Sequence, residues 1–332
     1  MSAPYPWLEG VWQRLLAGRP RPPQALLIAG PEGIGKRALA RAWAQALLCE
    51  SPLPSGEACG ACAGCHWFGA GTHPDFRLVS LIEKENDKGE MRLATEITVD
   101  QAREAVDFVQ MSTHRAGRRV VLVDAADAFN LAAANALLKV LEEPPLNTSF
   151  VLVSEQPRRL LPTIRSRCTR VELGLPTPEA ALAWLGEQGV AAAADWLALA
   201  GGAPLRAQRW AEAGGLAERN AILAALADPL RLDPVARAEA WKGVDPRAWH
   251  GLAYTWLCDL LAAHLAVRPR FNPDCAAALA GIAPQADLSR LLALARLHAE
   301  RGRSVLHPLN RQLQLEEWLI RYRNVFERGT RA

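Results

Sequence analysis

Residues 25–48 read ALLIAGPEGIGKRALARAWAQALL, and they carry the strongest structural signal in the chain. The apolar run from Ala25 to Ala29 predicts a buried strand. The glycine-rich segment 30–37 follows as a turn, and the alanine-rich segment 38–48 has the composition and length of a helix. A strand, a glycine-rich loop and a helix in this order are typical of nucleotide-binding α/β domains.

The glycine-rich segment matches the phosphate-binding pattern G-x-x-x-x-G-K-[ST] at every position but the last. In that pattern, backbone N–H groups hold phosphates and the lysine, here Lys36, neutralises them. Gly30, Gly33 and Gly35 supply the glycines, but the last position is Arg37, whose guanidinium has no acceptor atom with which to ligate Mg²⁺. An ordinary strand-to-helix turn is the alternative explanation. The context favours descent from a nucleotide-binding loop that has lost its metal hydroxyl.

A second apolar strand ends in VVLVDAAD at 120–127. Asp124 lies where a Walker B aspartate would hold the metal through water, and Ala125 lies where ATPases of this type carry the glutamate that polarises the attacking water. Considered alone, Asp124 fits an exposed carboxylate at a strand end equally well. Because the metal hydroxyl and the catalytic glutamate are both missing, a bound nucleotide is expected to remain unhydrolysed.

Four cysteines follow the loop helix at the spacing C-x9-C-x2-C-x2-C. They are Cys49, Cys59, Cys62 and Cys65. The last three present converging thiolates from one tight turn and the first completes a tetrahedron, so the spacing predicts one structural Zn²⁺. Buried reduced cysteines are the alternative, but they would not require C-x2-C twice in a short polar segment. His66 and His73 are close by in the sequence, although four sulfurs already fill a closed site.

Strand and helix signals alternate as far as residue 175 and give way to helices beyond it, which predicts a parallel α/β sheet followed by all-helical parts. Further strands are expected at 76–80, 119–123 and 149–154, and further helices at 101–109, capped by Asp100, and at 131–141. The charged segment 81–92 has no apolar period and is expected to be an exposed loop.

The composition changes near residues 173–176 and again at the Gly-Gly-x-Pro segment 201–204. We therefore expect a nucleotide-binding-like α/β domain at 1–173 with a zinc module at 49–65, a small helical domain at 174–208 and an all-helical domain at 209–332. Near the end of the chain, four apolar residues at helical spacing predict a packed face whose partner the sequence does not identify. They are Leu315, Trp318, Leu319 and Tyr322.

The chain of 332 residues is 50% hydrophobic and 22% charged, which excludes disorder as its main state and indicates a globular protein with sizeable cores. Lys and Arg exceed Asp and Glu by 38 − 35 = 3. This excess is too small to bind nucleic acid with the whole surface, so any DNA contact is expected to be local. The sequence contains neither a signal-peptide pattern at its start nor a long apolar run, so we expect a cytoplasmic protein without a membrane segment.

Five motifs, in their order along the chain, resemble the clamp-loader branch of the AAA+ ATPases. They are GPEGIGK, the four-cysteine insertion, VVLVDAAD, AANALLKVLEEPP at 133–145 and Ser-Arg-Cys at 166–168. AANALLKVLEEPP is highly specific to clamp loaders. With YPWL near the start and LNRQLQLEEWL at 309–319, the resemblance covers essentially the whole chain. The incomplete Walker motifs resemble the non-hydrolysing member of the complex rather than gamma/tau, in which both motifs are intact.

The resemblance implies a P-loop AAA+ domain, a small helical lid and a helical collar that holds a hetero-oligomeric ring with the gamma/tau and delta subunits of DNA polymerase III. It implies a stator subunit, which helps to load the sliding clamp onto primed DNA during replication and does not itself turn over ATP. Such a chain belongs to a DNA-directed DNA polymerase holoenzyme, a nucleotidyltransferase, without being its catalytic part.

Three more residues acquire expected roles through the resemblance. Taken alone, Arg167 in LLPTIRSRCTR at 160–170 is best explained as a solvated surface charge. The resemblance instead implies that Arg167 is an arginine finger, which reaches the ATP site of the neighbouring gamma/tau subunit. Ser154 matches the sensor 1 position, and Arg206 lies near the sensor 2 position at a loose spacing.

Two other functions are alternatives at this point. Lys36 and Asp124 would suffice for an active clamp-loader ATPase if Arg37 were displaced, and the retained lysine leaves nucleotide binding open. A free nucleotide-metabolising kinase is disfavoured, because no acceptor-substrate site is identifiable and the helical parts would lack a role. ATP hydrolysis by the isolated chain would separate the active ATPase from the stator.

Overall fold

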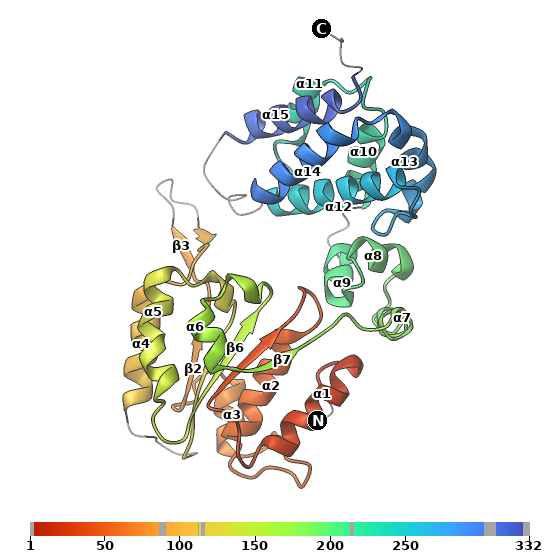
Figure 1. The fold of residues 1–332 in the computed structure, drawn as a ribbon. Helices are drawn as coiled ribbons and strands as arrows, with labels where there is room; N and C mark the ends of the chain where they lie inside the picture. The colour runs from red at the N-terminus through yellow and green to blue at the C-terminus, as the bar shows by residue number, and fades with distance from the viewer. Residues whose placement is uncertain are drawn as a thin grey trace. The chain divides into compact units, whose positions relative to one another are not determined.

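The computed structural model describes residues 3–85, 91–111, 113, 117–212, 216–301 and 310–327. The chain divides into two compact units, Met1–Trp184 and Leu185–Ala332, which are described separately (Figure 1). The division into three domains at 1–173, 174–208 and 209–332 stays a prediction. Among the described helices, none combines the length and the apolar character needed to cross a bilayer.

The first unit is built on a five-stranded parallel sheet in the order β2-β5-β6-β1-β7 (Figure 1). The strands are β1 (Ala25–Ala29), β2 (Phe76–Val79), β5 (Arg119–Val123), β6 (Thr148–Ser154) and β7 (Thr169–Glu172). Strands β1, β5 and β6 are buried along their whole length, as expected for the centre of a parallel sheet with helices packed on it. The predicted parallel α/β fold is confirmed.

Helices and short 3₁₀ turns surround the sheet. They are α1 (Glu9–Gly18), α2 (Lys36–Leu48), α3 (Ala63–Gly69), α4 (Val99–Gln110), α5 (Leu131–Glu142), α6 (Pro162–Arg167), η1 (Pro6–Leu8), η2 (Ala126–Ala128) and η3 (Pro157–Arg159). Helices α4 and α5 lie side by side (Figure 1). Their buried residues Phe108 and Leu137 join Val121 and Leu152 of the sheet in one apolar cluster. This packing places α5 against α4 and the sheet.

Two local predictions for this unit are wrong, and one edge strand was missed. Strand β7 was not predicted, because TRVE is a short edge strand with mostly exposed side chains and lacks an apolar run. The segment 81–92 is not simply a loop, because its described residues include β3 (Glu83–Glu85) and part of β4 (Met91–Leu93), which pair antiparallel. Helix α4 is capped by Thr98, whose N–H donates to the Gln101 side chain at 3.1 Å, and not by Asp100.

The described residues of the second unit form helices only, as predicted. They are the end of α7 (Pro178–Glu187), α8 (Ala193–Leu199), α9 (Pro204–Glu212), α10 (Leu216–Leu226), α11 (Pro234–Trp241), α12 (Pro246–His264), α13 (Ala276–Ile282), α14 (Leu288–Arg301) and α15 (Arg311–Asn324), with the short turns η4 (Pro273–Cys275) and η5 (Ala283–Gln285). Trp256 and Tyr322 are fully buried at its centre. The indole N–H of Trp256 donates to the Tyr322 hydroxyl at 2.8 Å, and that hydroxyl donates to the carbonyl of Leu226 at 2.7 Å.

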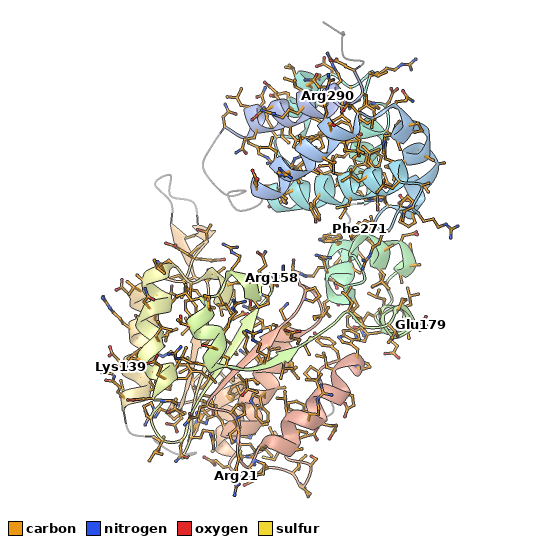
Figure 2. The ribbon with its side chains drawn as sticks, viewed as in Figure 1. Arg21, Lys139, Arg158, Glu179, Phe271 and Arg290 are labelled. Atoms are coloured by element: carbon orange, nitrogen blue, oxygen red, sulfur yellow. The ribbon has the colours of Figure 1, made fainter. Side chains whose placement is uncertain are left out.

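The predicted apolar face near the end of the chain packs into this core. Leu315, Trp318, Leu319 and Tyr322 of α15 all belong to its buried cluster. The end of α15 is tied down by Arg290 of α14, which donates to the carbonyls of Asn324 at 2.7 Å and Glu327 at 3.0 Å (Figure 2). A cation at a helix C-terminus also complements the helix dipole.

A polar cluster fixes the loop before α13 to the helices around it. Asp259 of α12 is 1% exposed and accepts hydrogen bonds from the backbone N–H groups of residues 270–272. Arg219 of α10 donates to the side chain of Asn272 at 2.8 Å. It also donates to both carboxylate oxygens of Asp274, at 2.6 and 2.9 Å. These bonds engage both terminal nitrogens of a nearly buried guanidinium and order the loop.

Candidate functional site

The glycine-rich loop between β1 and α2 requires glycine at two positions of the phosphate-binding pattern. Gly35 has a φ of 95°, and a Cβ atom there would lie 2.4 Å from the Tyr5 ring. At Gly30, a Cβ atom would lie 2.4 Å from the carbonyl oxygen of Leu173. Only glycine fits both positions, so the conformation of this loop depends on the two glycines of the pattern, although its last position is arginine.

An aromatic cluster from the start of the chain and from α7 lies against this loop. Trp7 donates its indole N–H to the carbonyl of Ile34 at 2.9 Å, and its ring is stacked on Tyr5 with centroids 5.1 Å apart. Trp184 meets both rings edge-on, at 5.7 Å from Tyr5 and 5.5 Å from Trp7. The YPWL motif was the only sequence signal of this contact. Its partners could not be identified because they are far away in the chain.

Arg37 and Asp124 form an ion pair. Arg37 takes the position of the metal-binding hydroxyl, and Asp124 takes the position of the Walker B aspartate. The Asp124 side chain is only 12% exposed, whereas that of Arg37 is 68% exposed. The guanidinium therefore neutralises the carboxylate that would otherwise attract Mg²⁺.

Lys36 is also engaged by the protein itself. Its side chain is 4% exposed, and its ammonium donates to the carbonyl of Pro31 at 2.7 Å and lies 3.7 Å from the Glu155 carboxylate. Burial lowers the pKa of Lys36, and this shift is opposed by Glu155, Glu32 and Asp127. Burial raises the pKa of Glu155, with Lys36 acting in the opposite direction. The lysine thus faces carboxylates where phosphates would need to bind.

The other residues predicted near the nucleotide site lie at the ends of β5 and β6 and in the second unit. Ala125 follows Asp124 with a left-handed backbone, φ 66°, and its methyl group has nothing with which to polarise water. Ser154 ends β6 beside the loop, where its carbonyl accepts a hydrogen bond from Gly30 N–H at 3.2 Å. Its buried hydroxyl has no partner among the residues that the structure describes. Arg206 belongs to the second unit, where it donates to the Ala200 carbonyl and lies over the Trp210 ring.

Arg167 lies at the end of α6, and its partners belong to α5 and α6 rather than to the phosphate loop. One terminal nitrogen of its guanidinium donates to the Thr163 carbonyl at 2.8 Å. The other forms an ion pair with Glu142 at the end of α5. The Arg167 side chain is 31% exposed, so the group is held but still reachable from outside. Glu142 was not singled out from the sequence, because its pairing depends on how α5 and α6 pack.

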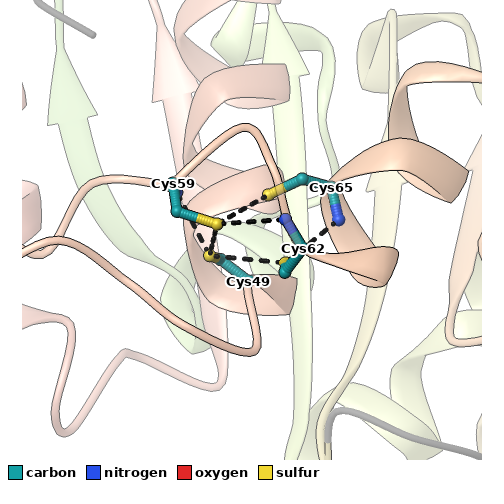
Figure 3. Close-up of side chains that lie close together, drawn as sticks. All are labelled: Cys49, Cys59, Cys62 and Cys65. Atoms are coloured by element: carbon teal, nitrogen blue, oxygen red, sulfur yellow. Dashed lines mark hydrogen bonds between the residues drawn. The ribbon is translucent and has the colours of Figure 1, made fainter.

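The four predicted zinc ligands converge, as Figure 3 shows. The sulfur of Cys49 lies 3.6 Å from that of Cys59 and 3.9 Å from that of Cys62, and the sulfurs of Cys59 and Cys65 are 4.0 Å apart. All four sulfurs lie within 4.8 Å of one another. A tetrahedron with zinc–sulfur bonds of about 2.3 Å has sulfur–sulfur edges of about 3.8 Å. A disulfide would require about 2.05 Å. The cluster therefore fits a tetrahedral metal site.

Backbone N–H groups around the cysteines prepare them to bind a cation. The N–H groups of Ala61 and Cys62 point at the Cys59 sulfur at 3.4 and 3.3 Å, and the N–H of Cys65 points at the Cys62 sulfur at 3.4 Å. Burial raises the pKa of the Cys62 thiol, but hydrogen bonds from the N–H groups of Cys65 and Glu50 and from the side chains of Cys65 and Cys59 together outweigh this effect, and the pKa falls to about 6. Burial raises the pKa of Cys49 and Cys65 instead, so these two thiols would lose their protons to a bound cation. Thiolates are the form in which cysteine binds metal.

A parallel sheet in this strand order, a glycine-rich loop of the phosphate-binding pattern after β1 and a helical second unit define a P-loop protein of the AAA+ class, in which Lys36 and Arg37 of that loop pair with acidic side chains. The family model "DNA polymerase III, delta subunit" matches residues 11–176, and the model of that subunit's C-terminal part matches residues 213–324. The chain belongs to the family of DNA polymerase III delta-prime subunits. It is therefore a clamp-loader subunit that takes part in DNA replication.

The comparisons with two individual delta-prime subunits agree with this assignment. The delta-prime subunit of Pseudomonas aeruginosa is 42% identical over 265 residues, which cover 78% of this chain and 76% of that protein. The delta-prime subunit of Escherichia coli is 32% identical over 98% of this chain and 97% of its own length. The tau subunit of Escherichia coli is 35% identical over 45% of this chain and 21% of its own length. A gamma subunit-related crystal structure from Thermotoga maritima covers 95% of this chain and 99% of its own length at 17% identity, with a TM-score of 0.43.

Proposed function

We propose that this chain is the non-catalytic stator of the DNA polymerase III clamp loader. In this role it assembles in the cytoplasm with the gamma/tau and delta subunits and helps to load the sliding clamp onto primed DNA. It does not hydrolyse ATP itself. The observation that carries the proposal is the ion pair between Arg37 and Asp124.

The electrostatics of the loop support this proposal. The two cations of the loop, Lys36 and Arg37, are surrounded by four acidic side chains. These are Glu32, Asp124, Asp127 and Glu155. Four carboxylates against two cations leave this region with a negative charge, which repels a triphosphate. Mg²⁺ could bind Asp124 only after the guanidinium of Arg37 had left it.

We propose that Arg167 acts in trans, as an arginine finger for a nucleotide that the neighbouring subunit binds. A guanidinium remains charged at all physiological pH values, and its planar fork matches two phosphate oxygens. Arg167 is partly exposed at a helix end and is not used by the chain's own phosphate loop. Because the chain belongs to a clamp-loader family, a neighbouring subunit would hold the nucleotide that Arg167 contacts.

We propose that Cys49, Cys59, Cys62 and Cys65 bind one structural Zn²⁺. When bound, the ion would contribute folding free energy rather than catalysis, because four sulfurs leave no coordination position for a substrate. The cysteines connect the end of α2 with the start of α3. The site would thus hold the insertion onto the helix that follows the phosphate loop.

The stator proposal is tested by measuring phosphate release from Mg²⁺-ATP by the isolated chain. A Lys36→Ala variant purified in parallel provides the background from contaminating ATPases. We expect both proteins to give the same rate, while only a mixture with gamma/tau and delta hydrolyses ATP in response to clamp and DNA. A rate well above this background, lost on Lys36→Ala, would instead establish the alternative function, an active ATPase that keeps Lys36 for its own chemistry.

A further inference from the structure

The guanidinium of Arg167 is held from two sides by two different elements. Thr163, within the same helix, accepts a hydrogen bond from one terminal nitrogen at 2.8 Å. Glu142, at the end of α5, pairs with the other terminal nitrogen. These two bonds fix the plane of the guanidinium and use two of its five N–H groups. Three N–H groups therefore lie outside these bonds and can serve a phosphate.

Glu142 ends a helix, α5, that packs against the apolar core of the first unit. Its neighbours on α5, Val140 and Leu141, are 6% and 5% exposed and belong to the apolar cluster of the first unit. The Glu142 side chain itself is 47% exposed and turns away from that core. A carboxylate that is placed by a packed helix can orient a mobile arginine side chain more accurately than a loop residue can.

The ion pair between Glu142 and Arg167 could either withhold Arg167 from a phosphate or orient it toward one. The strength of the pair decides between these two roles. An ion pair between partly exposed groups changes an equilibrium by about fivefold or less. Arginine fingers accelerate phosphoryl transfer by about 10³ to 10⁵. Glu142 is thus too weak a partner to withhold Arg167 from a transition state. It is strong enough to restrict the many rotamers of a long side chain before the phosphate arrives.

We propose that Glu142 is a positioning residue, which orients Arg167 toward the nucleotide of the neighbouring subunit. The inference rests on the proposed role of Arg167 as an arginine finger. Since orientation is needed for the transition state and not for binding ATP, Glu142 should affect kcat and leave KM for ATP unchanged.

The test uses clamp loader reconstituted from gamma/tau, delta and variants of this chain, with clamp- and DNA-stimulated ATPase as the readout. Glu142→Ala should lower kcat by roughly threefold or more at the site that Arg167 serves, with KM unchanged. Glu142→Gln retains a hydrogen-bond acceptor and should lose less. The matched control is Glu143→Ala, which removes the adjacent exposed glutamate at the end of α5 and should change nothing.

A double variant separates orientation from general structural damage. If Glu142 acts through Arg167, then Glu142→Ala should cause no further loss in a chain that already carries Arg167→Ala. Losses that multiply, an unchanged kcat for Glu142→Ala, or a raised kcat would each overturn the inference, and a raised kcat would indicate a lock. A different result would contradict the proposed role of Arg167 itself: Arg167→Ala alone would leave ATPase activity and clamp loading at the unmodified rate.

Discussion

Arg37 pairs with Asp124, so that the two positions from which a P-loop ATPase holds its metal are bound to each other. Because of this contact, Arg37 does more than leave the metal without a hydroxyl ligand. Loss of a Ser or Thr hydroxyl alone would weaken Mg²⁺ binding, whereas an arginine at that position also neutralises the remaining acidic ligand. Lys36 is likewise bonded to the Pro31 carbonyl and lies near Glu155. The two cations of the loop, Lys36 and Arg37, thus bind groups of the chain itself.

Arg37→Ser should restore Mg²⁺-dependent nucleotide binding to the isolated chain. The substitution frees Asp124 and returns the hydroxyl that ligates the metal. We expect calorimetry to detect Mg²⁺-dependent ATP binding by the variant, whereas binding by the unmodified chain should be weak and should depend little on Mg²⁺. Hydrolysis should still be absent and should require the further change Ala125→Glu, which supplies the group that polarises water.

The control for this prediction is Arg41→Ser, which removes an exposed arginine one turn further along α2. It should leave nucleotide binding as weak as in the unmodified chain. Equal binding by the Arg37→Ser and Arg41→Ser variants would show that the Arg37–Asp124 pair does not close the site.

The isolated chain should contain about one zinc when it is purified without added metal. Cys62→Ser should remove most of this zinc and lower the melting temperature, because a structural site binds its ion only in the folded state. Elemental analysis and thermal unfolding measure the two effects. Affinity for zinc should fall as the pH is lowered, because protons compete with the ion for the thiolates.

Cys258→Ser, which alters a cysteine of α12 in the second unit, should retain the zinc and serves as the control. A native protein without zinc, in which all four clustered thiols react freely with a thiol reagent, would exclude the site.

The sequence predicted the elements of this protein better than the contacts of its site. Buried strands such as β1 could be recognised because their apolar runs are local signals. The exposed edge strand β7 carries no such signal and was missed. The sequence showed that Arg37 departs from the phosphate-binding pattern and that Asp124 matches a Walker B aspartate. Their ion pair could not be predicted, because it depends on how β5 lies beside α2. The Glu142–Arg167 pair depends in the same way on tertiary packing.

Asp274→Asn should destabilise the second unit by about 1 kcal/mol at neutral pH, because it removes the charge that pairs with the nearly buried Arg219. Hydrogen bonds from Arg219 lower the pKa of Asp274. The stabilisation is therefore present above the unfolded-state pKa of about 3.9 and is lost as the pH falls through the lower folded-state pKa. Urea unfolding should show a difference between the two proteins at pH 7 that vanishes in strong acid.

Asp228→Asn is the matched control for this change. Asp228 pairs at 3.8 Å with Arg231, and both side chains are well exposed, at 56% and 89%. Its replacement should change the free energy of unfolding by less than about 0.5 kcal/mol. If Asp228→Asn and Asp274→Asn are equally destabilising at pH 7, burial of Arg219 does not strengthen its ion pair.

Arg167→Ala should leave the fold, the zinc content and assembly of the complex intact, because its ion pair with Glu142 is partly exposed and contributes about 1 kcal/mol or less to stability. It should nevertheless depress clamp- and DNA-stimulated ATPase and clamp loading by the reconstituted complex. A finger contributes about 10³ to 10⁵ in rate at its own site, and several sites in one ring reduce the overall effect.

Arg167→Lys should rescue little of this loss, because an ammonium keeps the charge but cannot donate two parallel hydrogen bonds from a planar fork. Arg165→Ala and Arg170→Ala are the controls, since these arginines flank the Ser-Arg-Cys motif without occupying its central position. Both should load clamps at the unmodified rate. If Arg165→Ala complexes fail while Arg167→Ala complexes load normally, the finger is a different arginine of this segment, although the chain would still be a delta-prime family member.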